Sequence, residues 1–171
     1  GTIGLPIYHE FLNKFGEIIR LDESGKIIDK IRISHGNSTL QPTIVAKSDS
    51  DALIFLRNAG DKPRRIVKLE TSDSGHSWNK MGALDLPNPN AAIDAISFQN
   101  QTLLVFNNTV RGRNNLSLAI SANKKWQVLY RFDHSQASNT SEFSYPTIIR
   151  GFDDKIHVLY TWNRELIKHI S

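Results

Sequence analysis

The sequence predicts an all-β protein, and more specifically a β-propeller. Several short segments are rich in β-branched and aromatic residues and are bounded by Gly, Asn, Asp or Ser, among them 52–57, 102–108, 116–121 and 155–162. The sequence has no sustained apolar stripe with the 3.6-residue period of a helix. Short strands of this kind predict the fold class, and the regular interval at which they return predicts the propeller.

The repeat is visible in three stretches of sequence. "QPTIVAK" begins at Gln41 and "YPTIIRG" begins at Tyr145, and "AIDAISF" lies halfway between them, with Asp94 in the place of the two prolines. Each stretch is followed by an apolar strand that ends in a polar cluster: "LRNAG", "FNNTV" or "TWNRE". A period near fifty residues, with four short strands in each unit, is typical of a propeller blade.

The remaining strands are expected on both sides of these stretches. Three strands are predicted before Gln41, at about 4–9, 16–22 and 27–34, and three more after Tyr145. The chain therefore forms a single propeller region, 1–171, of about three blades, with boundaries near 41, 93 and 145 and an incomplete blade at each end. Because propellers close with about 4–8 blades, we expect half a ring. Its expected partner is a missing N-terminal propeller half or a second copy of the chain.

Residues 71–78, "TSDSGHSW", are expected to form the tight turn between the third and fourth strands of their unit. In such a turn Asp73 accepts backbone N–H bonds, Gly75 takes a positive φ, and Trp78 packs beneath it. The corresponding stretch one unit later, "SANKKW", has neither the Asp nor the Gly. A turn tolerates this loss better than a catalytic motif does, so we interpret 71–78 as structural.

The composition excludes several kinds of site. The sequence has no cysteine, and its six histidines show no metal-type spacing with acids, so we expect no metal and no cofactor. The net charge of +4 and pI near 9.4 leave nucleic-acid binding as a third hypothesis. The Lys and Arg residues are scattered, however, and we expect no nucleic-acid partner. No apolar run approaches the ~20 residues of a membrane span, so no membrane partner is expected either. We expect a bacterial periplasmic or secreted protein rather than a cytoplasmic one.

The turn also carries a resemblance to a known family. Its residues match the Asp-box, S/T-x-D-x-G-x-T/S-W, of sialidases and related bacterial neuraminidase repeat proteins, at Thr71, Asp73, Gly75, Ser77 and Trp78. In the same order along the chain, "LPIYHE", "LQPTIV", "FSYPTII" and "VLYTWNRELIKHI" resemble the C-terminal half of a sialidase-like six-bladed propeller. The resemblance implies that the Asp-box lies at the periphery, away from the site. It also implies an exo-glycosidase that acts on sialic acid or a related terminal sugar.

The resemblance further implies candidate site residues. Sialidases bind their anionic sugar with three arginines and use a tyrosine nucleophile, a glutamate base and an aspartate acid/base. Arg57 matches the second arginine and Arg113 the third, with Arg111 as the nearby alternative and Arg164 as a further substrate-binding candidate. Arginine suits a carboxylate because its planar fork donates two parallel bonds. Tyr145 matches the position of the nucleophile.

Gln41 departs from the family pattern. Sialidases commonly have Glu before this proline, where it accepts the proton of the tyrosine, and an amide cannot do so. The first arginine and the aspartate of the family come from N-terminal blades that this sequence does not contain. Glu142 is close in sequence to Tyr145 but is expected to be exposed. Two functions remain open: an exo-glycosidase completed by further blades, and a non-catalytic carbohydrate-binding or scaffold propeller, which Gln41 favours.

Overall fold

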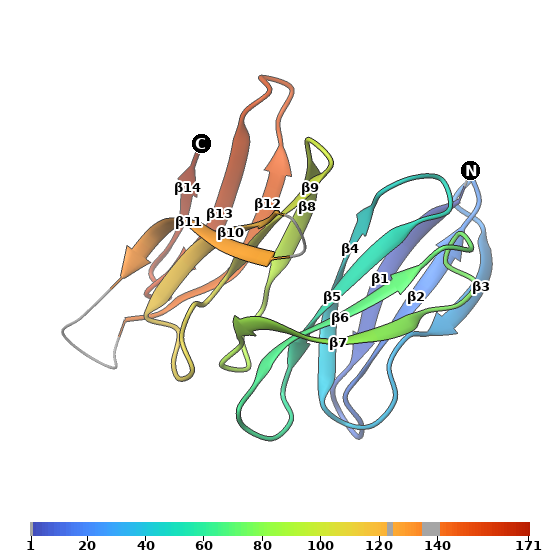
Figure 1. The fold of residues 1–171 in the computed structure, drawn as a ribbon, viewed down its shortest axis with the longest axis horizontal. Helices are drawn as coiled ribbons and strands as arrows, with labels where there is room; N and C mark the ends of the chain where they lie inside the picture. Colours follow the sequence, from blue (N-terminus) through green and yellow to red (C-terminus); the bar gives the residue numbers. More distant parts are fainter. Residues whose placement is uncertain (1, 123–124, 135–140) are drawn as a thin grey trace.

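The chain folds into four antiparallel sheets arranged as an arc (Figure 1). The computed structural model describes residues 2–122, 125–134 and 141–171, and these residues contain no helix. Each sheet follows the order of the chain. The first sheet consists of β1 (Ile3–His9), β2 (Phe15–Leu21) and β3 (Ile27–Arg32); the second of β4 (Thr39–Ala46), β5 (Ala52–Asn58), β6 (Arg65–Thr71) and β7 (Asn79–Pro87); the third of β8 (Asp94–Phe98), β9 (Gln101–Phe106), β10 (Asn115–Ala122) and β11 (Lys125–His134); and the fourth of β12 (Phe143–Arg150), β13 (Ile156–Trp162) and β14 (Leu166–Ile170).

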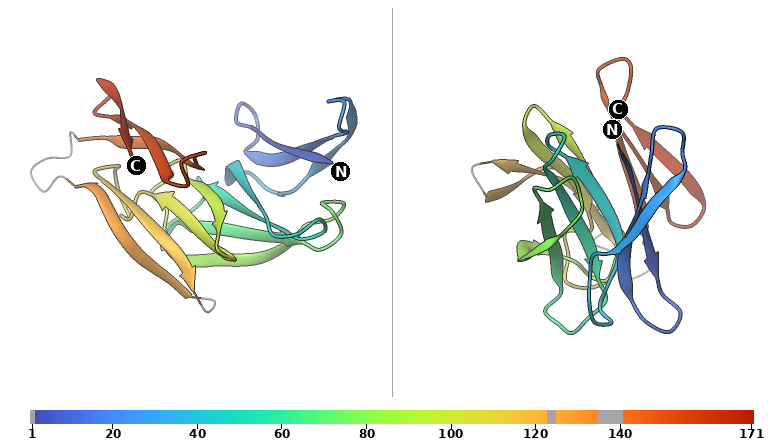
Figure 2. Two further views of the ribbon diagram at one scale, coloured as in Figure 1. Left: turned by 90° about the horizontal axis from the view of Figure 1, so that it is seen from above. Right: turned by 90° about the vertical axis from the view of Figure 1, so that its right-hand side faces the viewer.

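The sheets are arranged as the blades of a β-propeller, so the predicted all-β fold class is confirmed. Seen from above, they lie side by side around a common centre, and the first and fourth sheets border its open side (Figure 2). The first strand of each sheet is the inner one, because β1 contacts β4, β4 contacts β8, and β8 contacts β12. Two sheets have four strands and the two end sheets have three, which together supply about three blades.

The predicted strands agree with the observed ones to within about two residues. Those expected at 4–9, 16–22 and 27–34 correspond to β1, β2 and β3, and the fourth sheet has the three strands expected after Tyr145. The inner strands of the last three sheets begin at Thr39, Asp94 and Phe143. The division of the region at 41, 93 and 145 into separate blades stays a prediction. No helix of the described residues has the length and apolar character needed to cross a membrane.

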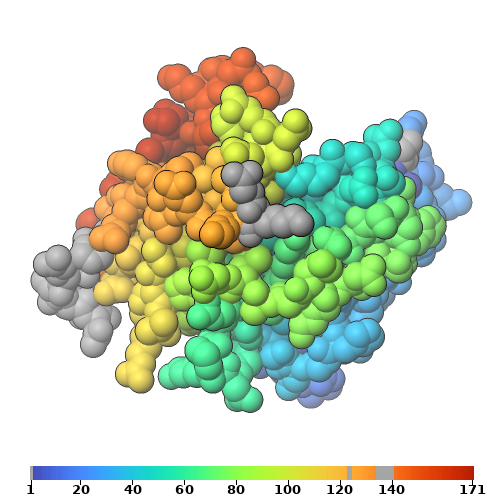
Figure 3. Space-filling view, viewed as in Figure 1, coloured from blue at the N-terminus to red at the C-terminus, as the bar shows by residue number. Residues whose placement is uncertain are grey.

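Neighbouring sheets are held together by three apolar cores, one in each space between two sheets. The side chains that alternate along each strand pack across these spaces. The space-filling view shows the second and third sheets meeting in one continuous surface (Figure 3). The buried members of the three cores are, from the first space to the last, Ile18, Ile33, Ile54, Leu56, Val67 and Leu69; Val45, Phe55, Ile66, Leu86, Ile93, Ala95, Leu104, Phe106 and Ala119; and Leu103, Val105, Leu116, Phe143, Ile148, Val158 and Tyr160.

Each of the two end sheets has an apolar face that no other described residues cover. In the first sheet, Ile3 and Leu5 are exposed, and their pairing partners across β2 are also aliphatic. In the fourth sheet, Ile149, Leu159 and Ile167 are exposed on three successive strands. An exposed apolar patch formed by several strands favours association with another surface.

The Asp-box forms the turn between β6 and β7. The Asp73 carboxylate accepts hydrogen bonds from the hydroxyls of Ser77 and Thr71, both at 2.6 Å, and from the Ser77 N–H at 2.9 Å. These bonds hold the pKa of Asp73 well below its usual 3.8. Gly75 adopts a φ of 80°, and Trp78 packs against the core between the first two sheets. The later counterpart, 121–126, lies partly outside the described residues.

The Asp-box lies at the end of the second sheet opposite to Gln41. Together with the β4–β5 turn at Ser48–Asp51 it lines a cavity of about 260 Å³, whereas Gln41 lies near the start of β4. The side chain of Arg20 in β2 donates to the backbone oxygen of Ser74 and so ties the first sheet to the turn. These contacts support a structural role for the turn.

We predict that Asp73→Ala and Trp78→Ala lower stability without changing ligand affinity. Truncation of the partly buried Trp78 is expected to cost about 3 kcal/mol. The native pKa of Asp73 lies below its unfolded value, so its contribution is complete above pH 3.8 and is lost as the pH falls further. The difference in melting temperature between wild type and Asp73→Ala should therefore be largest above pH 3.8 and should shrink as the pH is lowered further below that value. A loss of sugar binding at an unchanged melting temperature would contradict this role.

We also predict that the chain alone is not a stable monomer. The two open apolar faces should bind further blades of a longer polypeptide or a second copy, because exposed patches of this kind aggregate unless they are covered. Sedimentation velocity combined with mass spectrometry tests this prediction. A single compact species near 19.3 kDa with no companion peptide would refute it.

Candidate functional site

Gln41 and Tyr145 have the same unusual backbone geometry in two different sheets. Their φ angles are 48° and 51°, in the left-handed region, and each precedes a proline. At both places the strand pairing slips: pairing skips Gln41 between Leu40 and Pro42, and it skips from Ser144 to Thr147. A bulge re-aims the side chain of the extra residue, and strained residues of this kind cluster at functional sites. The geometry therefore marks both residues as site candidates.

The side chain of Gln41 connects two neighbouring groups. Its Oε1 accepts a hydrogen bond from Nη1 of Arg57 at 2.8 Å, and its Nε2 lies 3.3 Å from the hydroxyl of Tyr8 on β1. Both contacts join residues far apart in the sequence. The start of β4, which we call its axial end, is thus linked to β5 of its own sheet and to β1, the inner strand of the first sheet.

Arg57 is a buried cation with neutral partners. It is 7% exposed, and its Nε donates to Oδ1 of Asn90 at 2.8 Å while Nη1 donates to Gln41. Within the described part of the chain, no carboxylate forms an ion pair with it. Burial, followed by the nearby charge of Arg113, lowers the pKa of Arg57. A buried guanidinium held by amide oxygens has the capacity to bind an anion.

Arg113 lies beside Tyr145. Its Cζ is 5.2 Å from the centre of the Tyr145 ring, within the range of a cation–π contact. The backbone of Arg113 is fixed by the buried Asn107, and its carbonyl oxygen accepts from the N–H of Phe143 at 2.8 Å. Arg111, the alternative to Arg113, is exposed. The geometry therefore favours Arg113 as the arginine that accompanies Tyr145.

Glu142 corrects one expectation. It was predicted to be exposed, but its side chain is only 17% exposed and lies between two arginines. Its Oε1 accepts from Nη1 of Arg113 at 3.1 Å and from the Ser144 hydroxyl at 2.8 Å, and its Oε2 accepts from Nε of Arg164 at 2.8 Å. Burial acts to raise the pKa of Glu142, but these bonds and the two cations outweigh it and lower that pKa. The sequence gives no sign of this, because Arg113 and Glu142 are 29 residues apart.

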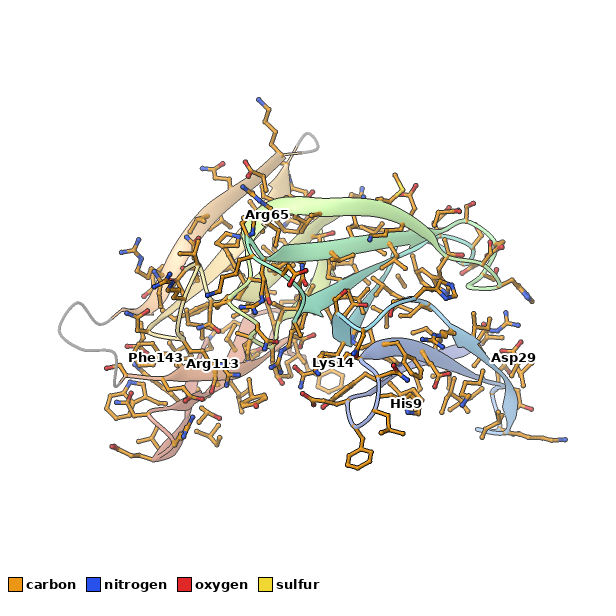
Figure 4. All side chains as sticks on the ribbon, turned by 90° about the horizontal axis from the view of Figure 1, so that it is seen from below. His9, Lys14, Asp29, Arg65, Arg113 and Phe143 are labelled. Atoms are coloured by element: carbon orange, nitrogen blue, oxygen red, sulfur yellow. The ribbon has the colours of Figure 1, made fainter. Side chains whose placement is uncertain are left out.

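The inner strands enclose an open hollow of about 400 Å³. Tyr8 and Gln41 line it together with Thr43 and Asp94. Arg113 points toward the middle of the arc, on the side where Lys14 also lies, whereas Arg65 lies at its outer side (Figure 4). The described residues contain no cluster of three or more His, Asp or Glu suited to a metal ion. Among the candidate site residues, Gln41 lines this hollow, whereas Arg57, Arg113 and Tyr145 do not; Arg57 adjoins it through its bond to Gln41.

Most of the predicted site residues therefore lie in one region. Gln41 contacts Arg57, Arg113 contacts Tyr145, and Arg164 joins them through Glu142, although its side chain is 76% exposed. Sequence reasoning missed Tyr8, Asn90 and the role of Glu142. The segment around Tyr8, "LPIYHE", carried part of the family resemblance, which was the one available signal for it.

A model of the BNR repeat-like domain family matches residues 1–158 of the chain. No curated protein sequence matches it. Among solved structures, a leech intramolecular trans-sialidase in complex with 2,7-anhydro-Neu5Ac is similar over 99% of this chain, with a TM-score of 0.72 and 15% identity. The K499G mutant of the NanB sialidase from Streptococcus pneumoniae is similar over 92% of this chain, with a TM-score of 0.66 and 17% identity.

An α-L-arabinofuranosidase of Fusarium graminearum in complex with arabinobiose is also similar, over 98% of this chain, with a TM-score of 0.58 and 12% identity. The matched region spans only 29% of the leech chain, 26% of the NanB chain and 49% of the Fusarium chain. At these identities the likeness establishes the fold. The three proteins are all glycan-processing enzymes.

Proposed function

This chain belongs to the BNR repeat-like domain family, and on that premise we propose that it forms the anion-binding side of a glycan-processing propeller. The proposed activity is that of an exo-glycosidase on terminal sialic acid or a related acidic sugar. The proposed site consists of Arg57, Arg113, Tyr145 and Gln41, with Arg164 at its rim. Groups from further blades are needed to complete it.

One observation carries the proposal: Arg57 is buried beside Arg113 and has neutral partners. Removing a charge from water is costly unless the charge is paired. A sugar carboxylate that accepts from Arg57 would supply the missing negative charge in charge-assisted bonds. Arg113 is less available, because Glu142 already neutralises part of its charge.

The proposed chemistry assigns one role to each residue. Arg57 holds the carboxylate of the sugar, and Arg113 supports it and faces the ring of Tyr145. The hydroxyl of Tyr145 attacks the anomeric carbon and gives its proton to a base from another blade, as the bond to the leaving oxygen breaks. A neutral phenol avoids the repulsion that an anionic nucleophile would meet from the substrate. Water then cleaves the bond between the sugar and Tyr145 and releases the sugar. An acid from another blade protonates the leaving oxygen.

A second function, sugar binding without hydrolysis, is favoured by Gln41. A phenol of ordinary pKa ~10 needs a base to react near neutral pH. The amide of Gln41 cannot accept a proton, and its two ends are already bonded to Arg57 and Tyr8. Turnover of a fluorogenic sialoside by the full-length protein distinguishes the two functions.

We predict that Arg57→Ala weakens binding of 3'-sialyllactose by tenfold or more, because hydrogen bonds to charged groups contribute about 1.5–3 kcal/mol. Isothermal titration of the full-length protein measures this, with lactose as the uncharged reference. Arg65→Ala is the matched control, since Arg65 lies on the outer side and pairs with the exposed Asp85. Equal affinity of the folded wild type for the two sugars would contradict the anionic specificity.

Gln41→Glu is predicted to raise hydrolytic activity in the full-length protein, because it places a proton acceptor at the axial end of β4. The kcat for a fluorogenic sialoside measures the effect. Gln41→Glu combined with Tyr145→Phe is the control and should lose the gain, because it removes the nucleophile. Unchanged or lower activity in a folded Gln41→Glu variant would show that position 41 is not the base position.

A further inference from the structure

We infer that Tyr8 is a ligand-contacting residue of the axial site, and that its hydroxyl donates a hydrogen bond to an oxygen of the acidic sugar held by Arg57. This inference rests on the proposed function and deepens it. It assigns a binding role to the first sheet, which carries none of the sequence-predicted site residues.

The orientation of the Gln41 amide is fixed by Arg57. A guanidinium has donors and no acceptor, so the Gln41 atom 2.8 Å from Nη1 of Arg57 must be the oxygen. The amide NH₂ then faces Tyr8, with its nitrogen 3.3 Å from the phenol oxygen. Gln41 is therefore the donor in this contact and Tyr8 is the acceptor.

This arrangement leaves the phenol proton of Tyr8 unused. The oxygen of Tyr8 accepts from Gln41, and among residues 2–122, 125–134 and 141–171 no group accepts the Tyr8 O–H. Tyr8 is 41% exposed and lines the 400 Å³ hollow between the inner strands, beside Gln41. The hydroxyl is thus available to a molecule in that hollow.

The chemistry of the neighbouring groups selects the ligand atom. Arg57 and Tyr8 flank Gln41 on its two sides, and both present donors. Their natural partner is an acceptor oxygen, such as that of a carboxylate or a carbonyl on the same sugar. No proton is transferred in this contact, so Tyr8 contributes to binding and not to bond cleavage.

The role of Tyr8 depends on the identity of residue 41. A carboxylate at this position has acceptors only and would take the Tyr8 O–H for itself. It would also pair with Arg57 and neutralise the cation that holds the sugar. Glutamine therefore keeps both donors free for the ligand, and Tyr8 and Gln41 should be energetically coupled.

The test is a double-mutant cycle on the full-length protein, with the Kd for 3'-sialyllactose as the readout. Tyr8→Phe keeps the ring and removes the hydroxyl, and it should raise the Kd about three- to tenfold. In the Gln41→Glu background the same change should alter the Kd less than twofold, because the O–H is already occupied. Tyr130→Phe is the matched control: Tyr130 is an exposed tyrosine on β11 that packs against Phe132, and its loss should have no effect.

The outcomes separate this inference from the proposed function. If the folded wild type does not bind 3'-sialyllactose more tightly than lactose, the proposed function fails and the inference fails with it. If wild type binds and Tyr8→Phe binds equally well, the inference alone is overturned. An equal loss in both backgrounds would assign Tyr8 a structural role and would also overturn it. Melting temperatures of all variants confirm that each protein is folded.

Discussion

The carboxylate of Asp94 fixes the inner strands relative to one another, and the site depends on that link. Neighbouring blades are joined by side-chain packing and not by a ladder of backbone hydrogen bonds. Packing alone fixes only weakly the position of one blade relative to the next along the propeller axis. Asp94 Oδ1 accepts from the Thr43 hydroxyl of β4 at 2.6 Å, and Oδ2 accepts from the Ile148 N–H of β12 at 2.9 Å. Thr43 and Ile148 come shortly after the bulged residues Gln41 and Tyr145. One side chain in the middle sheet therefore sets the axial height of both strained residues.

The charges around the axis are divided into two groups with different tasks. Glu142 accepts hydrogen bonds from both Arg113 and Arg164. This network positions Arg113 against Tyr145, and the Glu142 carboxylate neutralises part of the charge of Arg113. Within the described residues, Arg57 donates to amide oxygens and forms no ion pair, so no carboxylate neutralises it directly in its buried position. The attraction for an anion is therefore concentrated at Arg57, whereas the second group gives rigidity to the neighbouring wall.

The sequence predicted those features that follow from periodicity. A repeat centred on Gln41, Asp94 and Tyr145 located the inner strands, because each blade reuses the same pattern of apolar and polar positions. It did not predict the burial of Glu142 or the contact of Tyr8, because both arise from residues of neighbouring blades, 29 and 33 positions apart in the sequence. Nor did it show that Asp94 links three sheets, although it placed Asp94 where the other units have proline. Contacts between blades depend on the orientation of one blade relative to the next, and the spacing of residues along the sequence does not predict that orientation.

The Gln41–Tyr8 contact also couples ligand binding to the packing of the first sheet. Asp94 connects β4, β8 and β12, but the first sheet is joined to the second by their shared core, by the bond from Arg20 to Ser74 and by this contact. A ligand held by Arg57 and Tyr8 bridges the same two sheets, so its binding free energy adds to the energy that keeps them together. Further blades or a second copy that cover the open face at Ile3 and Leu5 would pack against the other side of the same sheet. Closing the ring and binding an acidic sugar are therefore expected to favour each other, because both hold the first sheet in one position.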